Sequence, residues 1–503
     1  MKDIQRKYVI REREPGFLRR HYSKLKTFFI TGAFGLLIGT QIYDPNKRVI
    51  EAMAGGILMF LLWKFSTIAA LWALLIMYPF PFSISWGTSN EIFMIIIVVV
   101  VLVRVATGVF RVTLDPKIRL PLILIVISYL ISFKNVPPGL MRLAIINTFN
   151  FFSAAAFMIL IINFVDDEEK LRKTLNVLMV SLALFIAFTI LEMLFPGRVL
   201  IPNWLYTAHK ARLVMKGVRM GGPFHDFELS AEFFALNAFL IFLMFIRSRR
   251  MLYRTLFGIL LLVDLFMMFT TITRGAIFSL IVGIAYLMFL SRKELNIVRI
   301  TYIVGVLAII LVVMEGVVAN YTISGSLYER VVATTFEKGL VPANRVGAWF
   351  PAIERGMEKP LFGHGAGWDF RAGLATEFWP HCLYLFYFNI TGLFGLGAFL
   401  FFMGRIIKST LSGVKSPLLT SSFPEALMKV MHVMVVIFLF DQIKIEYLRN
   451  GKYTYFIWFF FGLIIATHNI IIKQRSEREK ADLHSDIHAD DHPVSSPGVP
   501  RVI

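Results

Sequence analysis

Long apolar runs, separated by short polar or basic segments, recur along most of the 503-residue chain. Each run approaches the length needed to cross a hydrocarbon core of roughly 30 Å as a helix, which satisfies its own backbone hydrogen bonds in lipid. The pattern predicts an all-α protein with about 12 to 14 transmembrane helices. The predicted spans are residues 27–43, 50–64, 65–83, 90–110, 119–134, 143–165, 173–195, 230–247, 254–270, 275–291, 297–318, 381–407, 427–445 and 453–473.

The polar segments around these runs predict the domain organisation. Residues 1–26 form a basic N-terminal segment, residues 27–473 hold the predicted spans, and residues 474–503 form a polar tail. The tail cannot bury enough apolar surface to fold alone, so it is expected to be disordered. Two long loops, 196–229 and 319–380, interrupt the runs. The second loop has capping residues and helical apolar spacing, and we expect helices lying at the membrane surface there.

Composition and charge support a membrane protein and predict its orientation. Hydrophobic residues make up 57% of the chain and charged residues only 17%, unlike an ordinary soluble domain. Because Lys and Arg are retained on the cytoplasmic side of short loops, the basic segment "MKDIQRKYVIREREPGFLRRHYSKLK" places the N-terminus inside. Alternation then places the C-terminus inside and both long loops on the outer face. The net charge of +19 indicates orientation and contact with anionic membrane lipids, and it requires no nucleic acid.

Few residues have the chemistry of a metal or redox centre. Cys382 is the only cysteine, which excludes an intramolecular disulfide and a thiolate cluster, and it is expected to be a small buried hydrophobe. His484, His488 and His492 in the tail are spaced four apart but lack a folded scaffold. Carboxylates in the long loops are scattered instead of being spaced as metal ligands. We therefore expect neither a metal nor a cofactor.

Basic and titratable residues gather in the segments assigned to the outer face. The arginines are Arg219 in "VRMGGPFHDF", Arg274 in "TITRGA", Arg345 in "NRVGAW" and Arg449 in "YLRNGKY". Arg274 is the most informative, because it stands between two apolar runs, where a permanent charge needs a partner or water. His381 follows Pro380. Since proline is favoured in a first helical turn, His381 is expected at the positive end of a helix, where its ring stays neutral.

The order of these motifs resembles that of the O-antigen ligase and O-antigen polymerase superfamily. The chain has an Arg in R-x-x-G-P-F, then T-x-T-R-G-A opening a helix, then R-x-x-x-W followed by "EKPLFGHGAG". A His then starts a helix that contains "GLFGLGAF". The resemblance spans roughly residues 180 to 470 and is densest between residues 340 and 400.

The resemblance implies a C-type membrane glycosyltransferase fold with a large periplasmic helical loop. It implies transfer of a glycan from undecaprenyl diphosphate to a saccharide acceptor at the outer face of the bacterial cytoplasmic membrane, in surface polysaccharide or lipopolysaccharide biosynthesis. It further implies that Arg219 and Arg274 hold the donor diphosphate and that His381 is catalytic, whereas Arg345 matches the arginine before the Gly-rich turn. The family often has His-Asn where this chain has His381 and Cys382.

The chemistry of these residue types agrees with that reaction. Guanidinium groups bind phosphate oxygens bidentately and stabilise the charge that grows on a diphosphate leaving group, without a metal. The acceptor hydroxyl loses its proton as it attacks, and a neutral histidine such as His381 suits the role of base. His225 and His364 are candidate glycan contacts, and Trp368 is a candidate for stacking on a sugar ring.

The sequence also fits two other classes of protein. A transporter or flippase of lipid-linked saccharides also needs a basic cavity, and Glu192, Asp264 and Asp441 within the apolar runs could serve its ion coupling. An inactive scaffold in envelope assembly is a third class. Within the enzyme class, the sequence fits both a polymerase, which joins lipid-linked repeats, and a ligase, which moves a finished glycan. Basic residues on one face and no visible internal repeat favour an enzyme.

Overall fold

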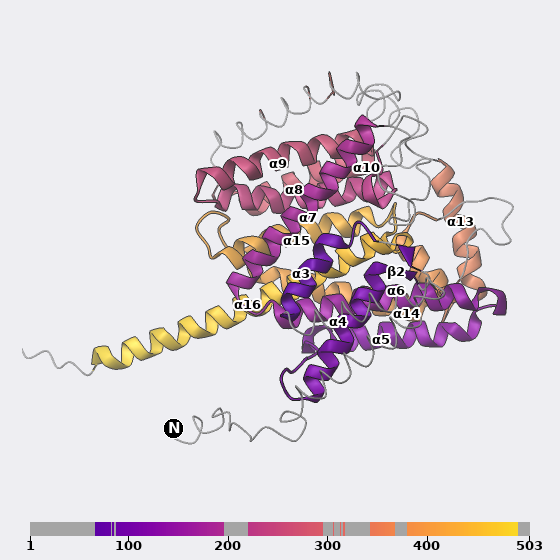
Figure 1. Cartoon of the computed structure of the whole chain (residues 1–503), viewed down its shortest axis with the longest axis horizontal. Helices are drawn as coiled ribbons and strands as arrows, with labels where there is room; N and C mark the ends of the chain where they lie inside the picture. Colours follow the sequence, from indigo (N-terminus) through magenta and orange to yellow (C-terminus); the bar gives the residue numbers. More distant parts are fainter. Residues whose placement is uncertain are drawn as a thin grey trace, which may run out of the picture. The chain divides into compact units, whose positions relative to one another are not determined.

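The computed structural model describes residues 66–81, 83–84, 87–195, 220–294, 343–367 and 380–490, with the single positions 305, 312, 315 and 316. In this part of the chain, nine helices are long and apolar enough to cross a membrane, and Thr67–Met77 and Arg274–Leu290 are shorter apolar helices. The protein is therefore an all-α, multi-pass membrane protein (Figure 1).

The described helices and strands have the following order along the chain. They are α3 (Thr67–Met77), β1 (Ser83–Ile84), β2 (Gly87–Thr88), α4 (Ser89–Ala106), α5 (Pro116–Ser132), η2 (Phe133–Asn135), η3 (Pro138–Leu140), α6 (Met141–Phe164), α7 (Glu168–Leu194), η5 (Gly222–Phe224), α8 (Phe227–Arg247), α9 (Met251–Thr270), α10 (Arg274–Leu290), α13 (Ala343–Glu358), α14 (Leu383–Val414), α15 (Phe423–Asp441), η7 (Tyr447–Arg449) and α16 (Gly451–Asp490).

The hydrophobic pattern predicts the positions of these helices well. Of the fourteen predicted spans, 27–43 and 50–64 lie outside the described residues, and only four single positions of 297–318 are described. Each of the other eleven coincides with a helix. One boundary needs correction. Helix α16 continues to Asp490, whereas the sequence predicts a disordered tail from residue 474. The segment "QRSEREKADL" is rich in strong helix formers, which extend a helix already anchored in the bundle.

Carboxylate caps set the starts of several helices. Asp167 accepts a hydrogen bond from the Lys170 backbone N–H at 2.7 Å at the start of α7. Asp226 accepts from the backbone N–H groups of Glu228 and Leu229, both at 3.0 Å, at the start of α8. Such caps satisfy N–H groups that have no partner inside the helix. The cap on α8 also fixes the position of a carboxylate in the candidate site.

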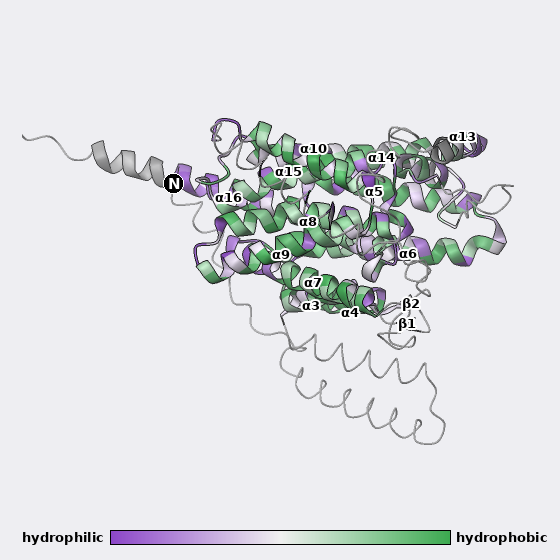
Figure 2. Ribbon diagram, turned by 90° about the horizontal axis from the view of Figure 1, so that it is seen from above, coloured by the Kyte–Doolittle hydropathy of each residue, from purple (hydrophilic) through white to green (hydrophobic). Residues whose placement is uncertain are grey.

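Helices α8, α15 and α16 supply the core of the bundle. In the 18-residue apolar stretch of these three helices, 78%, 78% and 83% of the residues are buried, compared with 28% in α9 and 39% in α5. Figure 2 shows hydrophobic residues along α8, α9 and α10. Because α9 and α5 expose apolar side chains such as Leu262 and Leu120, we assign their outer faces to lipid. Helix α8, in contrast, is surrounded mainly by protein.

Helix α14 is interrupted by a turn from the segment after α13. The backbone leaves the helical conformation at Gly392, with φ 69° and ψ −170°. Beyond this break, Leu393 N–H donates to the Pro360 carbonyl at 2.7 Å, and before it the Asn389 carbonyl accepts from His364 N–H at 2.7 Å. The turn in "KPLFGHG" and the helix in "NITGLFGLG" therefore form one hydrogen-bonded unit.

Candidate functional site

Segments distant in sequence meet at the N-terminal end of α8. The turn that begins at Met220 runs beside the end of α9, where Met220 N–H donates to the Thr270 carbonyl at 3.4 Å. Asn450, at the start of α16, donates from its side chain to the Phe224 carbonyl at 2.8 Å. Thr273, just before α10, donates to the carbonyl of Phe227 at 3.3 Å. The "GGPFHDF" and "TITRGA" motifs and the "YLRNGKY" segment are thus brought together.

Arg449 is at the centre of this polar cluster. Its Nη2 donates to Asp226 Oδ1 at 2.8 Å and to Glu228 Oε2 at 3.0 Å, and its Nη1 donates to His381 Nδ1 at 2.8 Å. Glu446 Oε1 lies 3.7 Å from Nη1. Burial lowers the pKa of Arg449, but Asp226, Glu446 and Glu228 outweigh burial and raise the pKa above its ordinary value. The guanidinium is thus a fixed charge whose hydrogen bonds orient the surrounding groups.

The contact with Arg449 sets the tautomer of His381. A guanidinium only donates hydrogen bonds, so Nδ1 of the ring must accept, and in the neutral ring the proton resides on Nε2. The His381 side chain is 35% exposed, whereas that of Arg449 is 14% exposed. His381 therefore carries its N–H donor at Nε2, on a ring that is partly exposed. Acceptance of a proton at Nε2 would require the other tautomer, in which protonated Nδ1 faces Arg449 as a second donor. The role of His381 as base stays a prediction.

Backbone strain is concentrated in the same cluster. Among the described residues, His225, Ile272 and His381 are the non-glycine residues with positive φ, at 53°, 50° and 44°. A positive φ is unfavourable for side chains in general and most of all for a β-branched residue such as isoleucine. Strained conformations of this kind persist where the surrounding structure enforces them, and they cluster at functional sites.

The position of His381 differs slightly from the prediction. Helix α14 begins at Leu383 with Cys382 as its N-cap, so His381 precedes the helix instead of lying in its first turn. Trp349 of α13 donates from its indole to the Pro380 carbonyl at 3.0 Å, and Leu383 N–H donates to the Gln442 carbonyl at 2.9 Å. The backbone is thus held on both sides of His381. Cys382 is 6% exposed, which confirms it as a small buried residue.

Arg274 is the one predicted diphosphate ligand whose surroundings are described. It is the first residue of α10, and the N-cap Thr273 makes no side-chain capping hydrogen bond. Lys444 lies over the adjacent Gly275, since a Cβ there would be 2.6 Å from Lys444 Nζ. Lys444 Nζ also pairs with Asp441 Oδ1 at 2.6 Å. Two cations therefore gather at the N-terminus of α10.

The other predicted site residues have different outcomes. Arg219 and Trp368 lie outside the described residues, and Arg345 lies in α13 among positions whose side chains are not described. His364 is 2% exposed, and its Nε2 donates to the Arg355 carbonyl at 2.8 Å. Burial lowers the pKa of His364, which favours the neutral form of the ring. The contact of His364 with glycan stays a prediction, and the ring that would make it is almost fully buried.

Sequence reasoning missed most of the acidic side of the cluster. Glu228 and Glu446 are 9% and 0% exposed, and with Asp226 they surround a single arginine. The cluster is therefore acidic around Arg449, whereas the sequence predicts a basic cavity. The signal for Asp226 is local, because an aspartate directly before "FELSAEFF" is a typical N-cap. No local signal in the sequence pairs Arg449 with Asp226 or Glu228, which precede it by 223 and 221 positions.

A second polar group lies deeper in the bundle. Glu232 is 1% exposed and accepts hydrogen bonds from Gln442 Nε2 at 3.0 and 3.1 Å and from the Tyr453 hydroxyl at 2.7 Å. Ser279 donates to Asp441 Oδ1 at 2.6 Å. Within the described part of the chain, no group of three or more acidic, histidine or cysteine side chains has an arrangement that could hold a metal ion.

These features define the class of protein, a multi-pass helical membrane protein with a strained polar site at one end of α8. Comparison of the chain with models of known protein families, and with curated proteins, gives no match.

Proposed function

We propose that the protein transfers a glycan from a polyprenyl-diphosphate donor to a saccharide acceptor at the N-terminal end of α8, as the motif resemblance implies. The observation that carries the proposal is the meeting of three such motifs, "GGPFHDF", "TITRGA" and the His381 segment, with the "YLRNGKY" segment, whose Arg449 donates to His381 at 2.8 Å. Three strained residues, His225, Ile272 and His381, lie in those motifs. The reaction belongs to the outer face of a bacterial cytoplasmic membrane.

The donor diphosphate binds at the N-terminus of α10 in this proposal. A helix N-terminus presents backbone N–H groups and a positive dipole to an anion. Arg274 begins this helix and adds its charge to the backbone donors, whereas Lys444 lies over Gly275 and shares its charge with Asp441. Arg219 remains a proposed ligand of the same diphosphate on the basis of the sequence. Arg449 is excluded from this role, because its hydrogen bonds are directed at Asp226, Glu228 and His381.

The roles at the reacting atoms follow from the tautomer of His381. The acceptor hydroxyl attacks the anomeric carbon, the bond from that carbon to the diphosphate oxygen breaks, and the hydroxyl proton passes to a base. His381 positions an oxygen of the substrate by donating from Nε2. Glu228 is the proposed base, because its Oε2 lies 3.9 Å from His381 Nδ1, within the cluster that would hold the acceptor hydroxyl.

The test is transfer by the purified protein in nanodiscs, supplied with a lipid-linked oligosaccharide and no ion gradient. We expect elongated or transferred glycan from the wild type, strong loss in Arg274→Ala and partial recovery in Arg274→Lys, since an ammonium keeps the charge but loses the bidentate fork. Arg292→Gln at the far end of α10 is the matched control and should retain activity. Full activity of Arg274→Ala would overturn the diphosphate assignment.

One observation favours a second candidate, an ion-coupled transporter of lipid-linked saccharides. Asp264 in α9 is 0% exposed, and both of its carboxylate oxygens lack a hydrogen-bond partner within the described residues. A buried carboxylate of this kind is a typical proton-coupling group in a membrane protein. The same nanodisc assay separates the two functions, because a transporter forms no new glycosidic bond. Movement of the donor across vesicles that requires a pH gradient and is lost in Asp264→Asn would support the transporter.

A further inference from the structure

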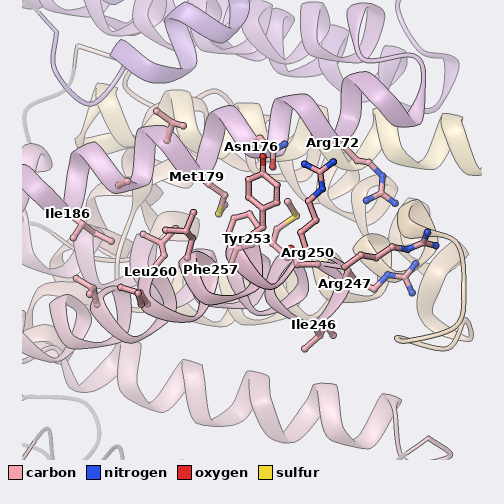
Figure 3. A pocket seen from close by; sticks show the side chains of 18 of the residues that line it. Arg172, Asn176, Met179, Ile186, Ile246, Arg247, Arg250, Tyr253, Phe257 and Leu260 are labelled. Carbon is pink, nitrogen blue, oxygen red and sulfur yellow. The ribbon is translucent and has the colours of Figure 1, made fainter.

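An open groove of about 1450 Å³ lies between α7 and α9. Figure 3 shows that its two ends differ in chemistry, with Arg172, Arg247 and Arg250 toward one end and Ile186 and Leu260 toward the other. The arginine end adjoins the C-terminus of α8. A helix of 21 residues is about 31 Å long, so this end is separated from the Arg449 cluster by the length of α8.

Positive charge is in clear excess at the arginine end. Four arginines, Arg172, Arg247, Arg249 and Arg250, line the groove there. Arg172 is paired with Glu168 through hydrogen bonds of 3.0 and 2.8 Å, and no carboxylate of the described residues forms an ion pair with the other three. Arg247 donates to the carbonyls of Leu419 and of Ser421, the latter at 2.8 Å. Four cations against one carboxylate leave an excess of three charges.

The rest of the groove is built for hydrocarbon. From Asn176 to Ile190, α7 contributes a lining about 21 Å long at 1.5 Å per residue, more than the roughly 15 Å of hydrocarbon in one leaflet. Ala183 and Ala187, one turn apart and both exposed, leave its floor unfilled by side chains. Tyr253 and Asn176 both line the groove and lie between its two ends (Figure 3). They supply polar groups between the arginines and the apolar part of the groove.

We propose that this groove binds an anionic phospholipid with two phosphates, a diphosphatidylglycerol, with the phosphates among the arginines and an acyl chain along α7. Guanidinium groups bind phosphate oxygens bidentately, and three excess charges spread over three segments match two phosphates better than one. Basic pockets between transmembrane helices recognise such headgroups by the same electrostatics. This site is independent of the proposed glycan transfer, because it lies at the other end of α8.

The first measurement is binding of diphosphatidylglycerol to delipidated full-length protein by native mass spectrometry. The variant Arg249→Gln with Arg250→Gln removes two exposed cations of the groove, whereas Arg292→Gln with Lys293→Gln removes two exposed cations just after α10. Each cation near a membrane surface contributes about 1 kcal/mol, so the first variant should bind roughly 10- to 30-fold more weakly. The control removes two cations that do not line the groove, so it should change binding less than about twofold. Equal losses in both variants would overturn the proposal.

A second variant separates a built groove from general attraction of lipid to a basic surface. Ala187→Phe fills the apolar part without changing the charge, and because Ala187 is exposed the fold should be retained. We expect it to weaken diphosphatidylglycerol binding by about fivefold or more if the acyl chain is lost from its place. Unchanged binding in Ala187→Phe would overturn the groove. Tighter binding of phosphatidylglycerol or of polyprenyl diphosphate than of diphosphatidylglycerol would overturn the assigned lipid.

Discussion

Arginine serves opposite purposes at the two ends of α8. At the N-terminal end, Arg449 is enclosed by Asp226, Glu228 and Glu446 and also donates to His381. At the C-terminal end, the arginines of the groove outnumber the single carboxylate paired with Arg172. The first arginine is neutralised by the protein itself, whereas the charge of the second group is left for a ligand.

The difference shows why counting basic residues misjudges a site. Arg449 contributes to the net charge of the chain as Arg250 does, but its hydrogen bonds are used to orient a histidine and two carboxylates. A buried cation in such a network is needed for the fold, because its removal leaves carboxylates without a counter-charge. An exposed arginine such as Arg250 contributes little to stability and more to binding. Substitutions that remove one cation from each end test this difference directly.

The largest effect is expected for Arg449→Gln. Breaking a buried ion pair by removing one partner costs about 3 to 5 kcal/mol, and here three carboxylates lose their shared cation. The free energy of unfolding, from denaturant titration in detergent, should fall by that amount. Arg250→Gln is the matched change near the C-terminal end of α8, and it should alter the free energy of unfolding by less than about 0.5 kcal/mol. A similar, small change in both variants would show that the enclosure of Arg449 does not stabilise the protein.

His381→Ala should have the next largest effect, on turnover and not on stability. Loss of one oriented hydrogen-bond donor typically lowers turnover about 10²- to 10³-fold. His381→Gln retains an N–H donor near the position of Nε2 and a group able to accept from Arg449, so its turnover should recover to within about tenfold of the wild type. The measurement is transfer rate per folded molecule. A His381→Gln variant as inactive as His381→Ala would restore the histidine to the role of base.

The helices and the meeting of motifs were accessible from the sequence, but the charge balance of the site was not. Apolar runs fix the spans because lipid requires helices of a set length. The turns before Arg274 and around His225 carry Gly, Pro and Thr signals that mark ends of helices, so their shared location follows once the helices alternate. The partners of Arg449 depend on contacts across more than 220 residues, for which a single sequence has no local pattern.

The tautomer of His381 was inaccessible for a related reason. Proline before the histidine predicts the start of a helix, and α14 does begin two residues later, at Leu383. The role of the ring, however, is decided by which group faces Nδ1. That group is Arg449, which follows α15 and is 68 positions away in the sequence. A helix boundary is a local property, whereas a proton position is a property of the assembled cluster.

The backbone that supports the His381 end should be less tolerant of side chains than the rest of α14. A Cβ on Gly392 would lie 2.3 Å from the carbonyl of Leu361 at a φ of 69°, so Gly392→Ala should destabilise by about 1 to 3 kcal/mol. Gly404, in the same helix, has nothing within 4 Å of its Cβ position. Gly404→Ala should therefore stabilise by up to about 1 kcal/mol through helix propensity. Thermal unfolding of the two variants should shift in opposite directions, and parallel shifts would argue against the interlocked turn.

The smallest effect concerns His364, the buried counterpart of the exposed His381. Burial is the main cause of its lowered pKa, and Lys359 and Arg355 act in the same direction, whereas the Arg355 carbonyl and Glu358 act against it. Below pH 6.5, the ordinary pKa of histidine, the unfolded chain binds a proton at this residue more readily than the folded protein does. The contribution of the His364 ring to the unfolding free energy is therefore complete above pH 6.5 and decreases as the pH falls below it. Each pKa unit corresponds to about 1.4 kcal/mol. His364→Gln keeps a donor for the Arg355 carbonyl but cannot titrate, so between pH 7.5 and about pH 5.5 its unfolding free energy should decrease less than that of the wild type.

The wild type and His364→Gln should transfer glycan at equal rates per folded molecule, because the ring lies inside the turn. An identical pH dependence would contradict the neutral buried ring, and loss of turnover would return His364 to the site.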